Sequence, residues 1–125
     1  MDDISVKRFN KMESYQDQGR FLYAGKSLGV TAWGMNILNL PANWPDYPDH
    51  DHAGEEQEEV YVVLRGDARL ESAGQTLKLE PGMAVRVGPR RKRKIIPGAD
   101  GVTLLAIGGT PGKAFAPKWA RGGQQ

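Results

Sequence analysis

Two histidines separated by one residue are the groups in this 125-residue chain best suited to chemistry. His50 and His52 are its only histidines, and in an extended segment side chains two apart project to the same face. Glu59 opens the next apolar run, where its carboxylate can turn back toward that face. Two imidazoles and one carboxylate can hold a divalent metal and leave coordination positions open. The spacing therefore predicts a metal site compatible with zinc, iron, manganese or nickel.

The composition excludes several other kinds of site and protein. The chain has no cysteine, so disulfides and thiolate metal sites are excluded, and any metal must be bound by nitrogen and oxygen. No apolar stretch approaches the roughly 18 residues of a membrane span, and no basic region followed by an apolar run begins the chain. We expect one cytoplasmic domain over residues 1–125 with no membrane partner.

Short strands are the elements expected to position these residues, because 16 glycines and eight prolines favour turns. The clearest is Glu59–Leu64, which Gly66 is expected to end. A polar loop or helical turn is expected over 11–19, and a proline-rich loop over 41–48. Further strands are expected at 6–9, 29–40, around His50 and His52, 68–71, 76–79, 84–87, 93–96 and 102–107. Many short strands joined by glycine and proline turns favour a sandwich or barrel.

These residues also resemble a known family, the cupins. His50-x-His52, then Glu59, then Gly66 after six residues is similar to the first cupin motif, and 82–97 follows the second motif in outline. The resemblance covers about 29–109 and is strongest to small single-domain cupins of the conserved-barrel, cupin-2 type. It implies an all-β double-stranded β-helix, or jelly-roll barrel, with metal ligands in its mouth. The tail over 110–125 is rich in glycine, proline and lysine, so we expect it to be irregular, with Phe115 and Trp119 as anchors for part of it.

The match departs from the family pattern at two ligand positions. The loop between His52 and Glu59 is longer than in the family, which leaves Glu58 as an alternative, although the spacing to Gly66 favours Glu59. The fourth ligand, a histidine in the family, falls on Arg93, or on Lys94 if the alignment shifts by one residue. Neither cation offers a lone pair to a metal at neutral pH.

Two interpretations of the site remain open, and enzymatic activity is uncertain in both. In the first, Arg93 lies beside the open metal position and binds an anionic small-molecule ligand through its carboxylate or phosphate. In the second, no metal is bound, Arg93 pairs with Glu59, and the barrel binds a small molecule. Tyr61 shares the inward face with Glu59; it either donates a proton or packs in the core. Arg93 and Tyr61 are therefore the candidate catalytic residues.

Two further features concern partners. The basic run Arg90–Lys94 suits phosphate backbones, but the net charge is only +2 and no aromatic residues interleave the run, so we expect no nucleic-acid partner. Alternation predicts that Arg91 and Arg93 point inward. The strand Glu59–Leu64 is apolar on both faces, which suggests packing against a partner subunit, and we expect a homodimer.

Overall fold

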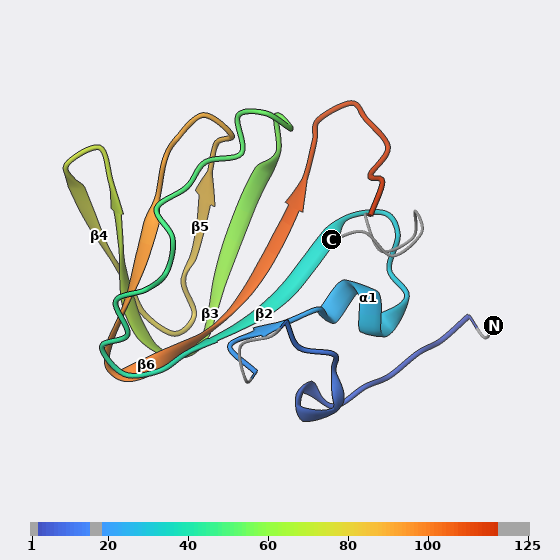
Figure 1. The fold of residues 1–125 in the computed structure, drawn as a ribbon, viewed down its shortest axis with the longest axis horizontal. Helices are drawn as coiled ribbons and strands as arrows, with labels where there is room; N and C mark the ends of the chain where they lie inside the picture. The colour runs from blue at the N-terminus through green and yellow to red at the C-terminus, as the bar shows by residue number, and fades with distance from the viewer. Residues whose placement is uncertain (1–2, 16–18, 118–125) are drawn as a thin grey trace.

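Two long antiparallel strands form the frame of the molecule. The computed structural model describes residues 3–15 and 19–117. Strand β3 (Glu58–Ser72) pairs with β6 (Lys94–Gly109) from Glu58↔Gly109 to Glu71↔Lys94. Both strands bend at the lower edge of Figure 1, so each contributes one half to either arm of the V-shaped arrangement. This shared frame joins two sheet layers into one jelly roll, and the all-β prediction is confirmed.

The shorter strands extend the two halves of this frame. β2 (Gly34–Leu40) pairs with the second half of β6, and the short β1 (Phe21–Leu22) pairs with β2. β5 (Ala84–Val87) pairs with the first half of β3, and β4 (Gln75–Leu79) with its second half. The expected hairpin across residues 72–75 and the expected strand 84–87 are both confirmed.

The bend in β3 lies at Gly66, where the sequence predicted the end of a strand. Register shifts flank this residue, and its φ of 77° lies in the left-handed region that favours glycine. A Cβ there would lie 2.1 Å from the carbonyl oxygen of Gly101 on β6. Glycine and the adjacent bulges let β3 turn a corner without ending. The separation of the expected strands 93–96 and 102–107 is likewise wrong, because β6 runs continuously through residues 97–101.

The N-terminal third differs most from the prediction. The expected strand 6–9 is absent; Val6 is 89% exposed and a 3-10 helix, η1 (Phe9–Lys11), follows. A short helix, α1 (Ala24–Leu28), ends at Gly29, whose left-handed φ of 83° caps it. The expected strand 29–40 therefore begins only at residue 34.

Two apolar clusters account for the core. The larger fills the barrel and includes Tyr61, Ile95 and Leu104, all fully buried. The smaller lies between the N-terminal segment and β2, where Ile37 faces it while its neighbour Leu38 faces the barrel. This alternation means that β2 is buried on both faces.

The described tail, 110–117, contains no helix or strand, as expected. A Cβ added at Gly34 would lie 3.3 Å from the ring of Phe115, so Phe115 contacts the start of β2. Trp119, the other predicted anchor, lies outside the described residues. No helix among the residues described here is long and apolar enough to cross a membrane.

Candidate metal centre

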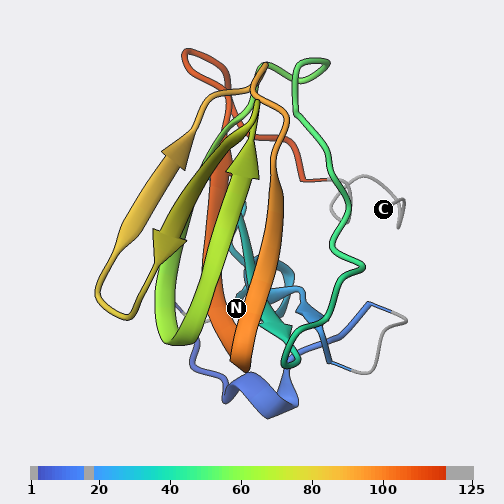
Figure 2. The same ribbon diagram turned by 90° about the vertical axis from the view of Figure 1, so that its left-hand side faces the viewer.

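The segment 41–57 carries both histidines and is fixed to the barrel by backbone hydrogen bonds. Figure 2 shows it, in green, running along the first half of β6. The His50 N–H donates to the Arg93 carbonyl at 3.0 Å, and the Arg93 N–H donates to the His50 carbonyl at 2.8 Å. The His52 N–H donates to the Pro89 carbonyl at 2.8 Å. An isolated bridge therefore positions the histidines where a regular strand was expected.

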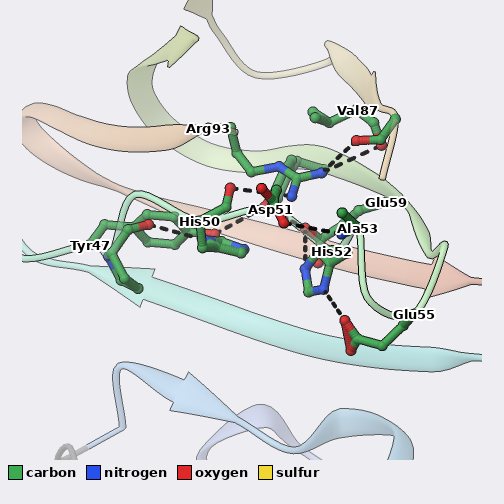
Figure 3. A network of polar contacts seen from close by, with 12 residues as sticks. Tyr47, His50, Asp51, His52, Ala53, Glu55, Glu59, Val87 and Arg93 are labelled. Atoms are coloured by element: carbon green, nitrogen blue, oxygen red, sulfur yellow. Dashed lines mark hydrogen bonds and ion pairs between the residues drawn. The ribbon is translucent and has the colours of Figure 1, made fainter. Parts of the chain in front are cut away.

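His50, His52 and Glu59 converge as the sequence predicted. One ligand atom from each lies within 4.8 Å of the other two, and no other such group occurs in residues 3–15 and 19–117. His52 Nε2 is 3.5 Å from Glu59 Oε1, and ligands about 2.0–2.2 Å from one ion lie at comparable separations. Figure 3 shows these side chains near one another, with Arg93 above the two histidines in this view. The side chains of His52 and Glu59 are 21% and 13% exposed, so solvent reaches the site.

The hydrogen bonds of the two imidazoles favour metal binding through Nε2. His50 Nδ1 is 3.0 Å from the Pro48 carbonyl oxygen, which only accepts, so the proton of a neutral His50 resides on Nδ1. His52 Nδ1 faces Glu55 Oε1 at 3.2 Å. Such outer partners orient metal-binding histidines. The buried His52 Nε2 has no hydrogen-bond partner. Buried polar atoms normally have one, and a metal ion bound to Nε2 would supply the missing interaction.

Two buried tyrosines stand behind the Glu59 carboxylate. The Tyr61 hydroxyl donates to Glu59 Oε1 at 2.5 Å. Its only proton is thereby used, so the Tyr47 hydroxyl, 2.9 Å away, donates to the Tyr61 oxygen. Burial is the main cause that raises the pKa of both tyrosines, and both remain donors over the physiological range. Tyr61 faces inward as predicted.

Tyr47 was missed by the sequence reasoning because it lies in the proline-rich loop 41–48. It is only 5% exposed, and its ring is 5.6 Å from that of His50. The signal in the sequence was an aromatic residue three positions before His50, near the end of the proline-rich loop.

His52 and Glu59 shift each other's pKa values in the directions that favour their charged forms. Burial raises the pKa of Glu59, but the interaction with His52, the hydrogen bond from Tyr61 and the charge of Arg93 together outweigh burial and lower that pKa below its ordinary value. The interaction with Glu59 raises the pKa of His52 against the effect of burial. Without a metal, the charged form of each group therefore stabilises the charged form of the other.

Arg93 faces inward as predicted, but its contacts differ from those expected. The residue has no exposed surface, and its guanidinium donates to the carbonyls of His50 and Val87 at 3.5 Å and of Gly88 at 3.3 Å. Within the described residues it forms no ion pair with Glu59, so the predicted pairing is not observed. Arg93 instead connects the His50 segment to the end of β5 and acts as a positioning residue.

The structure also places two other residues discussed in the sequence, Glu58 and Arg91. Glu58 points away from the cluster and forms an ion pair with Arg86, whereas Glu59 belongs to the cluster. Arg91, predicted to point inward, is exposed. The Arg91 N–H donates to the Gly88 carbonyl at 3.2 Å, which places Arg91 in a turn, where strand alternation does not apply.

Comparison with known proteins agrees with this architecture. No family model and no curated protein matches the sequence. Among solved structures, a cupin protein from Bacteroides fragilis is 26% identical, with a TM-score of 0.67 over 100% of this chain and 99% of its own. A sugar phosphate isomerase of the cupin superfamily from Silicibacter pomeroyi is 19% identical, with a TM-score of 0.69 over 83% and 74%.

A third solved structure, a cupin-2 domain protein from Shewanella frigidimarina, is 16% identical, with a TM-score of 0.51 over 61% of this chain and 69% of its own. The similarity to the cupin protein from Bacteroides fragilis extends over nearly the whole of both chains. His50, His52 and Glu59, which match the first cupin motif, lie close together in the structure. The chain is a small domain of the cupin superfamily.

Proposed function

We propose that this cupin domain binds a divalent metal ion through His50, His52 and Glu59, and that a small molecule completes the coordination shell. The observation that carries the proposal is the convergence of His50, His52 and Glu59, in which the buried His52 Nε2 makes no hydrogen bond and lies 3.5 Å from Glu59 Oε1. His50 offers a second nitrogen within the same small volume. The ligand set therefore fits an ion and leaves positions for a further ligand.

The donor set suits a borderline first-row ion such as zinc, iron, manganese or nickel. When bound, such an ion acts as a Lewis acid toward an oxygen of its ligand. The chain itself orients His50 through Pro48, orients His52 through Glu55 and holds Glu59 through Tyr61. These contacts orient the three side chains, and therefore their metal-ligating atoms, in the absence of a metal.

An anionic small molecule is the class of ligand that this site would favour. A divalent ion brings two positive charges and the nearby Arg93 a third, against the negative charges of Glu59 and of Glu55, which contacts His52. Arg93 is fully buried, so it acts through its field, which also helps to lower the pKa of Glu59. The similarity to a sugar phosphate isomerase, at 19% identity, shows the fold alone. The proposal therefore concerns binding and assigns no reaction.

A metal-free binding protein is the second candidate, and one contact favours it. His52 Nε2 lies 3.5 Å from Glu59 Oε1, and Tyr61 donates to the same oxygen. A protonated His52 and Tyr61 together neutralise and solvate the carboxylate without an ion. In this alternative the barrel binds its small molecule directly.

Metal analysis of protein purified without a histidine tag separates the two candidates. The protein is equilibrated with a mixture of zinc, iron, manganese and nickel salts and then freed of unbound ions. Wild type should retain close to one ion per chain. The His50→Ala/His52→Ala and Glu59→Gln variants should retain almost none.

The matched control is Glu58→Gln, which removes a neighbouring carboxylate that points away from the site. It should bind metal as wild type does. A wild-type protein that stays metal-free, or equal losses in Glu58→Gln and Glu59→Gln, would contradict the metal proposal and favour the metal-free candidate.

A further inference from the structure

A concave region of the surface contains none of the proposed metal ligands. It is a cleft of about 660 Å³ between the β3–β4 hairpin, residues 71–76, and the segment that precedes β6. In Figure 1 the hairpin turn and this segment lie near each other at the upper left. The charged residues that line the cleft are Asp49, Glu71, Arg90, Arg91, Lys92 and Lys94.

The two walls of this cleft are joined by specific contacts. The Ser72 hydroxyl, in a residue that is 9% exposed, donates to the Lys92 carbonyl at 2.5 Å. Glu71 is the register partner of Lys94 where β3 and β6 pair. These contacts fix the position of the hairpin relative to the basic run Arg90–Lys94. The cleft is therefore largely preformed, as small-molecule sites usually are.

The charges along the cleft are not balanced. Arg90 already pairs with Glu56, and Glu71 already accepts from Arg69. The three cations that remain, Arg91, Lys92 and Lys94, form no ion pair within the described residues. Asp49 is the one lining carboxylate left to oppose them. The cleft therefore carries a surplus of positive charge.

We propose that this cleft binds a small phosphorylated molecule through its phosphate groups. Arginine and lysine are the side chains that recognise phosphate, and the volume falls in the range of about 300–1,000 Å³ typical of small-molecule sites. No aromatic residue lines the cleft, so it lacks the stacking surface on which single-stranded nucleic acid bases bind. The phosphate, and not a base, is the group recognised.

The hairpin turn allows the charge of the cleft to be changed without harming the fold. Ala73 and Gly74 have φ values of 50° and 76°, as in a type I′ turn, for which Asp-Gly and Asn-Gly are the favoured pairs. Ala73→Asp should therefore fold at least as well as wild type while adding a negative charge to the cleft wall. Ala73→Asn is its neutral, isosteric control.

The experiment is calorimetric titration with inorganic pyrophosphate at low and physiological ionic strength, on full-length protein treated with a chelator that is then removed. Wild type and Ala73→Asn should bind equally, and binding should weaken as salt is added. Ala73→Asp, Arg91→Gln and Lys92→Gln should each weaken binding roughly two- to five-fold, as expected for solvent-exposed charge pairs. Lys11→Gln, an exposed lysine on η1 outside the cleft, should leave binding unchanged.

The same titration on His50→Ala/His52→Ala separates this proposal from the metal proposal, because pyrophosphate should bind that variant as well as wild type. No saturable binding, equal affinities for Ala73→Asp and Ala73→Asn, or loss of binding in the double histidine variant would overturn the cleft as a phosphate site. Tighter binding of a single-stranded RNA, weakened by the same variants, would overturn the assignment to a small molecule in favour of a nucleic-acid backbone.

Discussion

The Tyr61 hydroxyl donates a hydrogen bond of 2.5 Å to Glu59 Oε1, two residues earlier on the same strand. Both side chains face the barrel interior because strand side chains alternate. The bond holds one carboxylate oxygen in place and helps to lower the pKa of Glu59. Tyr61 is thus a positioning residue for the proposed metal ligand Glu59, and its fully buried ring is at the same time part of the core.

Removing this donor should weaken metal binding. Tyr61→Phe should lower metal affinity by roughly ten- to a hundred-fold, the usual effect of losing an outer-shell partner. Tyr47→Phe should have a smaller effect, because Tyr47 reaches Glu59 only through Tyr61. Competition with a chromophoric chelator measures both affinities. A larger loss in Tyr47→Phe than in Tyr61→Phe would contradict the proposed direction of the hydrogen-bond chain.

The stability of the metal-free protein should depend on pH through His52 and Glu59. The folded pKa of His52 is raised from 6.5, so its stabilising effect is complete below that value and is lost as the pH rises through the raised pKa. The folded pKa of Glu59 is lowered from 4.5, so its effect is complete above that value and is lost as the pH falls through the lowered pKa.

Thermal unfolding of wild type and His52→Gln, with chelator present, tests this pH dependence. The difference in Tm between the two proteins should be largest between pH 4.5 and 6.5 and should shrink on either side. A difference that is constant with pH would mean that the His52–Glu59 interaction does not form.

The bend at Gly66 should be the least tolerant glycine position of the barrel. Gly66→Ala places a Cβ 2.1 Å from a backbone oxygen of β6 and should cost more than about 3 kcal/mol of unfolding free energy. Gly74→Ala has nearly the same positive φ but no atom within 4 Å of the added Cβ. It should cost only about 1–2 kcal/mol. Chemical denaturation measures both, and equal losses would show that strain, and not the close crossing of β3 and β6, determines the requirement for glycine.

The outward face of β3 is expected to form a homodimer interface. Val60 and Val62 on this face are half-buried, and Leu64 and Met83 are 43% and 42% exposed. Leu64→Lys should shift sedimentation toward the monomer, because it places a charge at an apolar contact. Leu77→Lys, at a leucine on β4 with 38% exposure, should not. A monomeric wild type would contradict the expectation.

The fold could largely be predicted from the sequence, and the local pairing of its strands was the most reliable part. Alternation placed β4 and β5 correctly, since it depends only on neighbouring residues. The continuity of β3 through Gly66 could not be predicted, because it depends on Gly101, which is distant in the sequence. The helix α1 was missed because a five-residue element is too short to show a periodic pattern.

For the site, too, features set by nearby residues could be predicted from the sequence, and features set by distant residues could not. The spacing of His50, His52 and Glu59 sufficed to bring the three together. The contacts of Arg93 did not follow from its type, because its partners are backbone carbonyls of His50, Val87 and Gly88. Charge complementarity suggested Glu59 as its partner, whereas the backbone of the segment around His50 determines where the guanidinium lies.

Anomalous diffraction from crystals of the tag-free protein soaked in manganese or zinc salt tests the central claim most directly. The account predicts one strong peak bonded to Nε2 of His50, Nε2 of His52 and a carboxylate oxygen of Glu59, and no peak at Glu58. A wild-type crystal with no peak among these three side chains, or with ions bound only elsewhere, would contradict it.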